Sequence, residues 1–96
     1  MNVRTSSAAE SEIVESLQFY YEESLDAAAA FMAELEEANE LIGLQPTLYP
    51  LYYQEVRVKQ LDRFPFSIYF SIGEDDIYIL SVAHNSRKPD FWKNRL

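Results

Sequence analysis

The spacing of apolar positions divides the chain into a helical first half and a strand-forming second half. In residues 7–42, apolar side chains recur every three or four positions, which is typical of helices with one buried face. In residues 54–83 they recur every second position, which is the period of a β-strand. A short segment at residues 1–5 precedes the helices and is predicted to be an edge strand.

Two helices joined by a short turn are predicted in the first half. Ser7 and Glu10 have the spacing of a capping box, so the first helix is expected to begin at Ser7. Ser24 is a candidate N-cap for the second helix, and Gly43 is expected to end it. The break between the helices is only two or three residues long, which favours an antiparallel helical hairpin.

Three strands are predicted after a linker at residues 44–53. Residues 54–60 and 66–72 alternate apolar and polar side chains, while residues 77–83 are apolar on both faces, as in a central strand. The order β-α-α-β-β-β predicts an α+β fold in two layers, with the helical hairpin packed on an antiparallel-rich sheet. We expect residues 1–96 to form this single domain, with a short final helix at residues 89–95.

Composition excludes several classes of protein. The chain has no cysteine, so disulfides and thiolate metal sites are excluded. No apolar run approaches the ~20 residues of a membrane span, and the first residues have no apolar signal region. The acidic side chains of the helices lack the histidines of a carboxylate metal centre, and we interpret them as a solvated helix face. We expect a soluble cytoplasmic protein with no membrane attachment and no cofactor.

The net charge of −8 is distributed unevenly along the chain. Residues 1–55 hold eleven acids and one base, whereas residues 56–96 hold five acids and seven bases. Local charge therefore matters more than the total for the choice of partner. Basic side chains gather with an aromatic one just after the last predicted strand, which marks a candidate binding or catalytic site. Its members are His84, Arg87, Lys88, Trp92, Lys93 and Arg95.

Three motifs follow one another in the second half. Tyr49-Pro50-Leu51 precedes a basic strand, Arg63-Phe64-Pro65-Phe66 is followed by Ile68-Tyr69-Phe70, and residues 82–95 have the form V-A-H-x-x-R-x-P-x-x-W-x-x-R. With the order of the elements, they resemble the RelE/ParE superfamily, the toxins of bacterial type II toxin–antitoxin modules, which include plasmid stabilisation systems. The resemblance implies a toxin held inactive in a hetero-oligomer with a cognate antitoxin. RelE-like members cleave messenger RNA in the ribosomal A site, and ParE-like members poison DNA gyrase.

By resemblance, Arg57, Lys59 and Arg87 match basic positions of the nuclease members. Cations around a scissile phosphate stabilise the charge of the transition state. Arg57 and Lys59 are two apart on a strand and share a face, on which Arg87 would have to converge. The alternative is that the strand pair is only a solvated face. Ser67 stands where the nucleases have an arginine, and their C-terminal proton-transfer residue has no clear match, so the nuclease constellation is incomplete.

The other candidates also allow two interpretations each. His84, the only histidine, suits acid–base chemistry, but we prefer a structural hydrogen-bonding role at a strand end. Trp92 is either an interface residue or part of the core. Arg87 either binds a ligand or pairs with Asp90 or a helix carboxylate. The remaining candidates for binding are Arg63, Lys93 and Arg95.

We therefore predict a ParE-like toxin that inhibits growth by binding a protein target, DNA gyrase, and that a cognate antitoxin neutralises. One alternative is a RelE-like, ribosome-dependent mRNA endoribonuclease that uses Arg57, Lys59 and Arg87. A second alternative is a non-toxic binding module with the same fold. The antitoxin is expected to bind as a helix, or as an added strand, across the sheet and hairpin. The acidic hairpin is a candidate for attracting a basic segment of that antitoxin.

Overall fold

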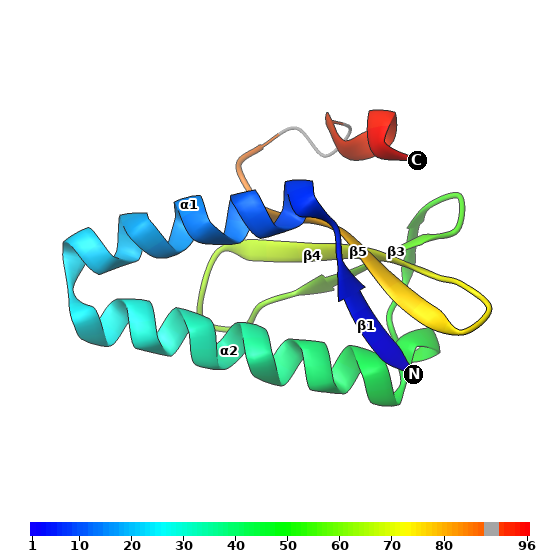
Figure 1. Cartoon of the computed structure of the whole chain (residues 1–96), viewed down its shortest axis with the longest axis horizontal. Coiled ribbons are helices and arrows are strands. Elements are labelled where there is room, and N and C mark those ends of the chain that lie inside the picture. The colour runs from blue at the N-terminus through cyan, green and yellow to red at the C-terminus, as the bar shows by residue number, and fades with distance from the viewer. Residues whose placement is uncertain (88–90) are drawn as a thin grey trace.

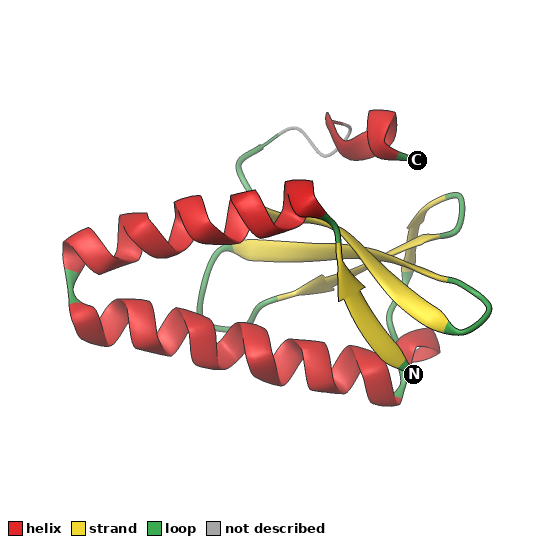
Figure 2. Ribbon diagram, viewed as in Figure 1, coloured by secondary structure: helices red, strands yellow, loops and turns green. Residues whose placement is uncertain are grey.

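The computed structural model describes residues 1–87 and 91–96, which fold as two helices against a sheet (Figure 1 and Figure 2). The elements in order are β1 (Asn2–Thr5), α1 (Ser7–Glu23), α2 (Leu25–Leu44), a 3₁₀ turn η1 (Pro46–Leu48), β2 (Leu51–Tyr53), β3 (Val56–Gln60), β4 (Phe66–Ile72), β5 (Asp76–His84) and a C-terminal 3₁₀ turn η2 (Phe91–Arg95). Within the described ranges, the strands form one sheet in the order β1-β5-β4-β3-β2. β1 runs parallel to β5 and the other neighbours are antiparallel, so the predicted α+β fold is confirmed.

The N-cap of the first helix lies one residue earlier than the predicted capping box placed it. Ser6, not Ser7, is the N-cap, and its Oγ accepts a hydrogen bond from the backbone N–H of Ala9 at 3.1 Å. The backbone N–H of Ser6 also donates to the carbonyl of Ile79 on β5 at 3.0 Å. The helix therefore starts at the residue where β1 stops pairing with β5.

The second helix begins as predicted and ends later. Ser24 caps it, because its Oγ accepts from the backbone N–H of Ala27 at 2.9 Å. The predicted stop at Gly43 is wrong, since the helix continues through Leu44 and Gly43 has no positive φ. A Cβ at Gly43 would lie 3.1 Å from the carbonyl oxygen of Met1, whose ammonium group donates to the Gly43 carbonyl at 2.9 Å. The glycine thus allows the N-terminus to approach the helix closely.

The predicted linker at residues 44–53 contains the turn η1 and the additional strand β2. β2 pairs with β3, which begins at Val56 and not at the predicted residue 54. Gln54 occupies the hairpin between them with φ of 49°, a left-handed conformation that few non-glycine residues adopt.

The pairing between β4 and β5 contains a bulge. Leu80 of β5 is the extra residue, since Tyr69 pairs with Ser81 and Phe70 pairs with Ile79.

The sheet buries apolar side chains on both faces, because successive residues of a strand point to opposite sides. Ile68 and Phe70 of β4 belong to the main core under the helices, with Phe31 of α2. Tyr69, between them, belongs to a second cluster with Val56 and Trp92. The helical hairpin thus covers one face as predicted, and the C-terminal turn η2 covers part of the other.

Candidate functional site

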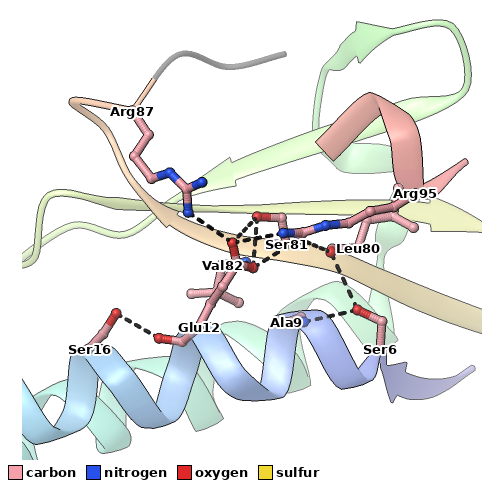
Figure 3. Close-up of polar contacts among 9 residues, drawn as sticks. All are labelled: Ser6, Ala9, Glu12, Ser16, Leu80, Ser81, Val82, Arg87 and Arg95. Atoms are coloured by element: carbon pink, nitrogen blue, oxygen red, sulfur yellow. Dashed lines mark hydrogen bonds and ion pairs between the residues drawn. The ribbon is translucent and has the colours of Figure 1, made fainter. Parts of the chain in front are cut away.

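A polar network centred on Glu12 joins α1, β5 and the C-terminal turn (Figure 3). Its Oε1 accepts hydrogen bonds from the backbone N–H of Val82 at 3.1 Å and from Ser81 Oγ at 3.0 Å. Arg95 Nη1 donates to the same oxygen at 3.1 Å, and Arg87 Nη1 lies 3.4 Å from Oε2. The side chain of Glu12 is 12% exposed, so one nearly buried carboxylate receives two strand donors and two arginines.

The network occupies the part of the β5 edge that β1 does not cover. β1 pairs with β5 only as far as Ile79, so among the described residues no strand neighbours the rest of β5 on that side. The carbonyl of Leu80 instead accepts from Arg95 Nη1 at 2.9 Å and from Ser6 Oγ at 3.4 Å. With the bond from Val82 to Glu12, these side chains satisfy backbone groups that a further strand would otherwise pair.

The predicted cations Arg87 and Arg95 therefore have internal partners. Their guanidinium carbons also lie over the ring of Phe91, at 3.6 Å for Arg87 and 5.1 Å for Arg95. Of the two interpretations of Arg87, pairing with a helix carboxylate is the one observed, and that carboxylate is Glu12. The other partner considered, Asp90, lies outside the described residues, as does the candidate Lys88.

Arg57 and Lys59 share a face of β3, as predicted, but it is not a solvated face. They pair with Phe70 and Ile68 of β4, whose side chains lie in the main core, so both cations point to the side of the sheet that carries the helices. Arg57 Nη1 donates to the carbonyl of Tyr49 at 2.7 Å, and Lys59 Nζ lies 5.0 Å from the centre of the Tyr49 ring.

Arg87 does not converge on this pair. It follows β5, whereas Arg57 and Lys59 are on β3, and β4 lies between these two strands. Arg87 contacts α1 through Glu12, while Lys59 lines a hollow beside α2 with Glu34 and other residues. The expected cluster of three cations is therefore not formed.

Ser67 is 3% exposed and points away from the helices, next to Tyr69 on the same strand. Its Oγ donates to Asn85 Oδ1 at 2.6 Å, which ties the middle of the sheet to the turn after β5. Burial raises the pKa of Tyr69 above its ordinary value; repulsion by Tyr52 adds to the rise, and a hydrogen bond with Ser67 opposes it. Ser67 thus has a structural partner at the position where the nuclease members have an arginine.

His84 takes part in hydrogen bonds at the end of β5. Its Nδ1 accepts from the backbone N–H of Ser86 at 3.0 Å and lies 2.8 Å from Ser86 Oγ. Its carbonyl accepts from the backbone N–H of Arg87 at 3.0 Å, and its ring meets the ring of Phe66 edge-on with centres 5.2 Å apart. The histidine therefore shapes the turn that leaves β5.

Trp92 belongs to the core and not to an exposed interface. It is 0% exposed, and its ring contacts those of Tyr52, Tyr53 and Tyr69 at centre separations of 5.2 to 6.1 Å. Its Nε1 is buried without a hydrogen-bond partner among the described residues. Lys93 Nζ lies 3.9 Å from the centre of the Tyr53 ring. The predicted binding candidates of the tail thus hold the tail on the sheet.

Arg63 is an exposed candidate whose backbone is fixed by a buried acid. Glu34 of α2, 7% exposed, accepts hydrogen bonds from the backbone N–H groups of Asp62 and Arg63. Glu34 and Glu12 were assigned to a solvated helix face, and this assignment is wrong for both. The signal for Glu34 was its spacing, because it lies three residues after Phe31 and four before Ala38 on the buried side of the helix.

A cavity of about 300 Å³ lies between α1 and the end of β5, and both Arg87 and His84 line it. Phe19, Tyr20 and Phe66 supply apolar walls, so it can receive an apolar side chain of a partner. Within residues 1–87 and 91–96, no three acidic or histidine side chains meet in a way that could hold a metal ion. No helix in these ranges combines the length and apolarity needed to cross a bilayer.

Comparison with known proteins assigns the fold to a family. The family model of the ParE toxin of the type II toxin–antitoxin system, parDE, matches residues 3–89. A solved structure described as the chromosomal ParDE TA system from P. aeruginosa superposes with a TM-score of 0.77 at 19% identity, covering 88% of this chain and 95% of that one. No curated protein sequence matches the chain. Since the family model spans nearly the whole chain, the protein belongs to the family of ParE toxins of type II toxin–antitoxin systems.

Proposed function

We propose that this ParE-type toxin stops growth by binding a protein target, DNA gyrase, in the cytoplasm, and that a cognate antitoxin neutralises it. The observation that carries the proposal is that the cations available for RNA cleavage are engaged inside the fold and lie apart. Arg57 donates to the Tyr49 carbonyl, and Arg87 pairs with Glu12 on the other side of β4. Cleavage of RNA by cations and a proton-transfer group needs them around one phosphate.

The charge of the chain also favours a protein target. Residues 56–96, the more basic part of the chain, hold seven bases against five acids, and this small excess is a poor match for an RNA phosphate backbone, whose binding depends strongly on Lys and Arg contacts. Ser67 also argues against an endoribonuclease, since it is buried and hydrogen-bonded to Asn85 at the position where the nuclease members have an arginine. A toxin that acts through surface contacts needs none of these groups to be free.

The test has three arms. Induced expression of the chain without antitoxin should arrest growth, and the purified chain should inhibit DNA supercoiling by gyrase in a concentration-dependent manner. Normal supercoiling at a large excess of protein would rule out gyrase as the target. Transcripts mapped after induction should keep their normal 5′ ends, whereas codon-phased cuts would establish the endoribonuclease instead. Growth that continues unchanged would favour a non-toxic binding module.

A double variant distinguishes the two mechanisms further. Arg57→Ala and Lys59→Ala together remove the β3 cations on the face that carries the helices. Growth arrest should persist in this double variant if the toxin acts by binding, provided that its folding is unchanged by circular dichroism. Loss of arrest with intact folding would point to the endoribonuclease.

A further inference from the structure

Four leucines are exposed in succession where α2 ends and the chain passes through η1 into β2. Leu44 is 77% exposed, Leu48 is 68% exposed and Leu51 is 59% exposed. One turn before Leu44, Leu41 is 41% exposed. We name these four residues the leucine corner; α2 ends at the right of Figure 1, so the corner lies far from the hairpin turn. Exposed apolar side chains that lie together mark an interaction site more often than scattered ones do.

The strand member of the corner lies on the side of the sheet that carries the helices. Leu51 of β2 pairs with Arg57 of β3, and residues that pair across two strands point to the same side. Arg57 points to the helix side, where it donates to the Tyr49 carbonyl beside η1. Leu44 and Leu48 line one hollow of about 310 Å³ at this end of α2. Leu51 and the leucines of α2 and η1 are therefore available to the same partner.

β2 is an edge strand, because β3 is its only neighbour in the sheet among the described residues. The backbone N–H of Val58 donates to the carbonyl of Pro50 at 3.1 Å, so the Pro50 carbonyl points towards β3. Successive residues of an antiparallel strand direct their backbone groups to opposite sides, so the N–H and the carbonyl of Leu51 point to the outer edge. Two such strands can pair antiparallel, with one Leu51 opposite the other.

The leucine corner belongs to the longest uncharged stretch of this acidic chain. Residues 41–54 contain no charged side chain, although 25% of all residues are charged, and the first acids on either side are Glu40 and Glu55. The same surface on a second copy can therefore meet the corner without like charges opposed at the centre. The acids at residues 22–26 lie at the other end of the 20-residue helix α2, roughly 30 Å away, which is beyond the Debye length of about 8 Å.

We propose that two copies of this chain associate through the leucine corner and the outer edge of β2. The two Leu51 residues exchange backbone hydrogen bonds, and Leu44 and Leu48 of one copy pack against the same residues of the other around a twofold axis. The corner is small beside the roughly 20–30 residues that each partner gives to a standard interface, so the dimer should be weak and should form at high protein concentration. The inference goes beyond the proposed function and does not depend on it.

The association test measures the mass of the purified full chain by sedimentation velocity over about a hundredfold range of protein concentration. The mass should rise from one copy towards two and no further, because a twofold contact closes on itself. Added salt should tighten the dimer, since it screens the repulsion between two chains that each have a net charge of −8. A chain that stays monomeric, a mass that grows past two copies, or a dimer that salt dissociates would each overturn the proposal.

Paired variants locate the contact. Leu44→Ser with Leu48→Ser changes the two most exposed members of the corner and should weaken the dimer by at least about tenfold. The matched control is Val14→Ser with Tyr21→Ser, since both residues are 62% exposed and lie on α1, outside the corner. The control should dimerise as the wild type does. Equal weakening by the two pairs would overturn the proposed location.

A single introduced cysteine tests the pairing of the two β2 strands, because the chain has no cysteine of its own. In a pair of residues that exchange both hydrogen bonds, the Cα atoms lie about 5.5 Å apart, a separation that a disulfide can span. When molecular oxygen oxidises the thiols, Leu51→Cys should therefore form a covalent dimer. Val14→Cys, at an exposed position of α1, should form one much more slowly. Equal rates for the two variants would contradict the strand pairing.

Growth assays separate this contact from the action of the toxin. If the wild-type chain is monomeric and the Leu44→Ser, Leu48→Ser variant no longer arrests growth, the leucine corner contacts the protein target and the proposed dimer is overturned. If the wild-type chain dimerises through the corner and leaves growth unaffected, the dimer stands and only the proposed growth inhibition is contradicted.

Discussion

Glu12 Oε1 on the first helix and Arg95 Nη1 in the C-terminal turn lie 3.1 Å apart, although 83 positions separate the two residues in the sequence. The same guanidinium nitrogen donates to the carbonyl of Leu80. Helix α1, strand β5 and the turn η2 are therefore held together at one point. Since the two side chains are only 12% and 26% exposed, solvent screens this pair less than it screens a surface pair.

Replacement of Glu12 by Ala should lower the free energy of unfolding by about 2 to 4 kcal/mol. The change leaves the Val82 N–H and the Ser81 hydroxyl without their acceptor, and Arg95 keeps only the Leu80 carbonyl. Urea denaturation followed by circular dichroism measures the loss. Glu15→Ala, at an exposed position of the same helix, is the control and should stay within about 0.5 kcal/mol of wild type. Equal stabilities of the two variants would mean that the network does not hold the fold.

Trp92 reports whether the C-terminal turn is docked, because it is the only tryptophan in the chain and is fully buried. Its fluorescence should peak at a shorter wavelength than that of free tryptophan in water and should resist quenching by acrylamide. Arg95→Ala should increase quenching, since it removes the link from η2 to Glu12 and Leu80. Arg63→Ala should leave it unchanged. A wild-type tryptophan quenched as readily as the free amino acid would contradict the docked turn.

Glu34 should be needed to hold the loop between β3 and β4. In Glu34→Ala the backbone N–H groups of Asp62 and Arg63 lose their acceptor, which should cost about 1 to 3 kcal/mol of stability. Amide hydrogen exchange should accelerate at these two residues. Glu37→Ala on an exposed position of the same helix should change neither quantity. Unchanged exchange in the Glu34 variant would show that the loop is held by other contacts.

Stability should fall at alkaline pH because of two tyrosines, one buried and one partly buried. Burial raises the pKa values of Tyr20 and Tyr69, so the folded state holds these phenolic protons more tightly than the unfolded chain does. This contribution is fully present below the unfolded pKa of about 10 and is lost as the pH rises through the raised pKa values. Unfolding measured against pH should therefore depend less steeply on pH above about 10 in Tyr69→Phe than in wild type. Identical slopes would contradict the raised pKa.

The fold could be predicted because its signals are local. The period of apolar residues distinguishes helices from strands, and Ser24 marks the break between the helices by its own side-chain bond to Ala27. The predicted N-cap of α1 and the predicted end of α2 were wrong where contacts with residues distant in the sequence are made. Gly43 lies inside α2, where its lack of a side chain leaves room for Met1, and Ser6 is the cap at the point where its backbone N–H continues the pairing with Ile79.

The candidate site was harder to predict because it depends on which side chains meet. The sequence placed cations at Arg57, Lys59 and Arg87 but could not show that β4 separates them. It also could not show that the tail folds back onto the sheet, where Trp92 is buried and Arg95 donates to Glu12. Glu12, which binds the tail through Arg95, could not be recognised among the ten acidic residues of the hairpin, because only its contact with β5 distinguishes it from the others.

A helix side chain, Glu12, satisfies part of the edge of β5, so its loss should affect the tendency of the protein to aggregate. An uncovered strand edge is a template for pairing with other chains, and natural proteins protect such edges. Glu12 occupies the N–H of Val82 and brings a negative charge to that edge. A chain that loses Glu12 would therefore present a bare β edge while it is still mostly folded. Intermolecular aggregation, more than complete unfolding, is then the expected fate of that variant at high concentration.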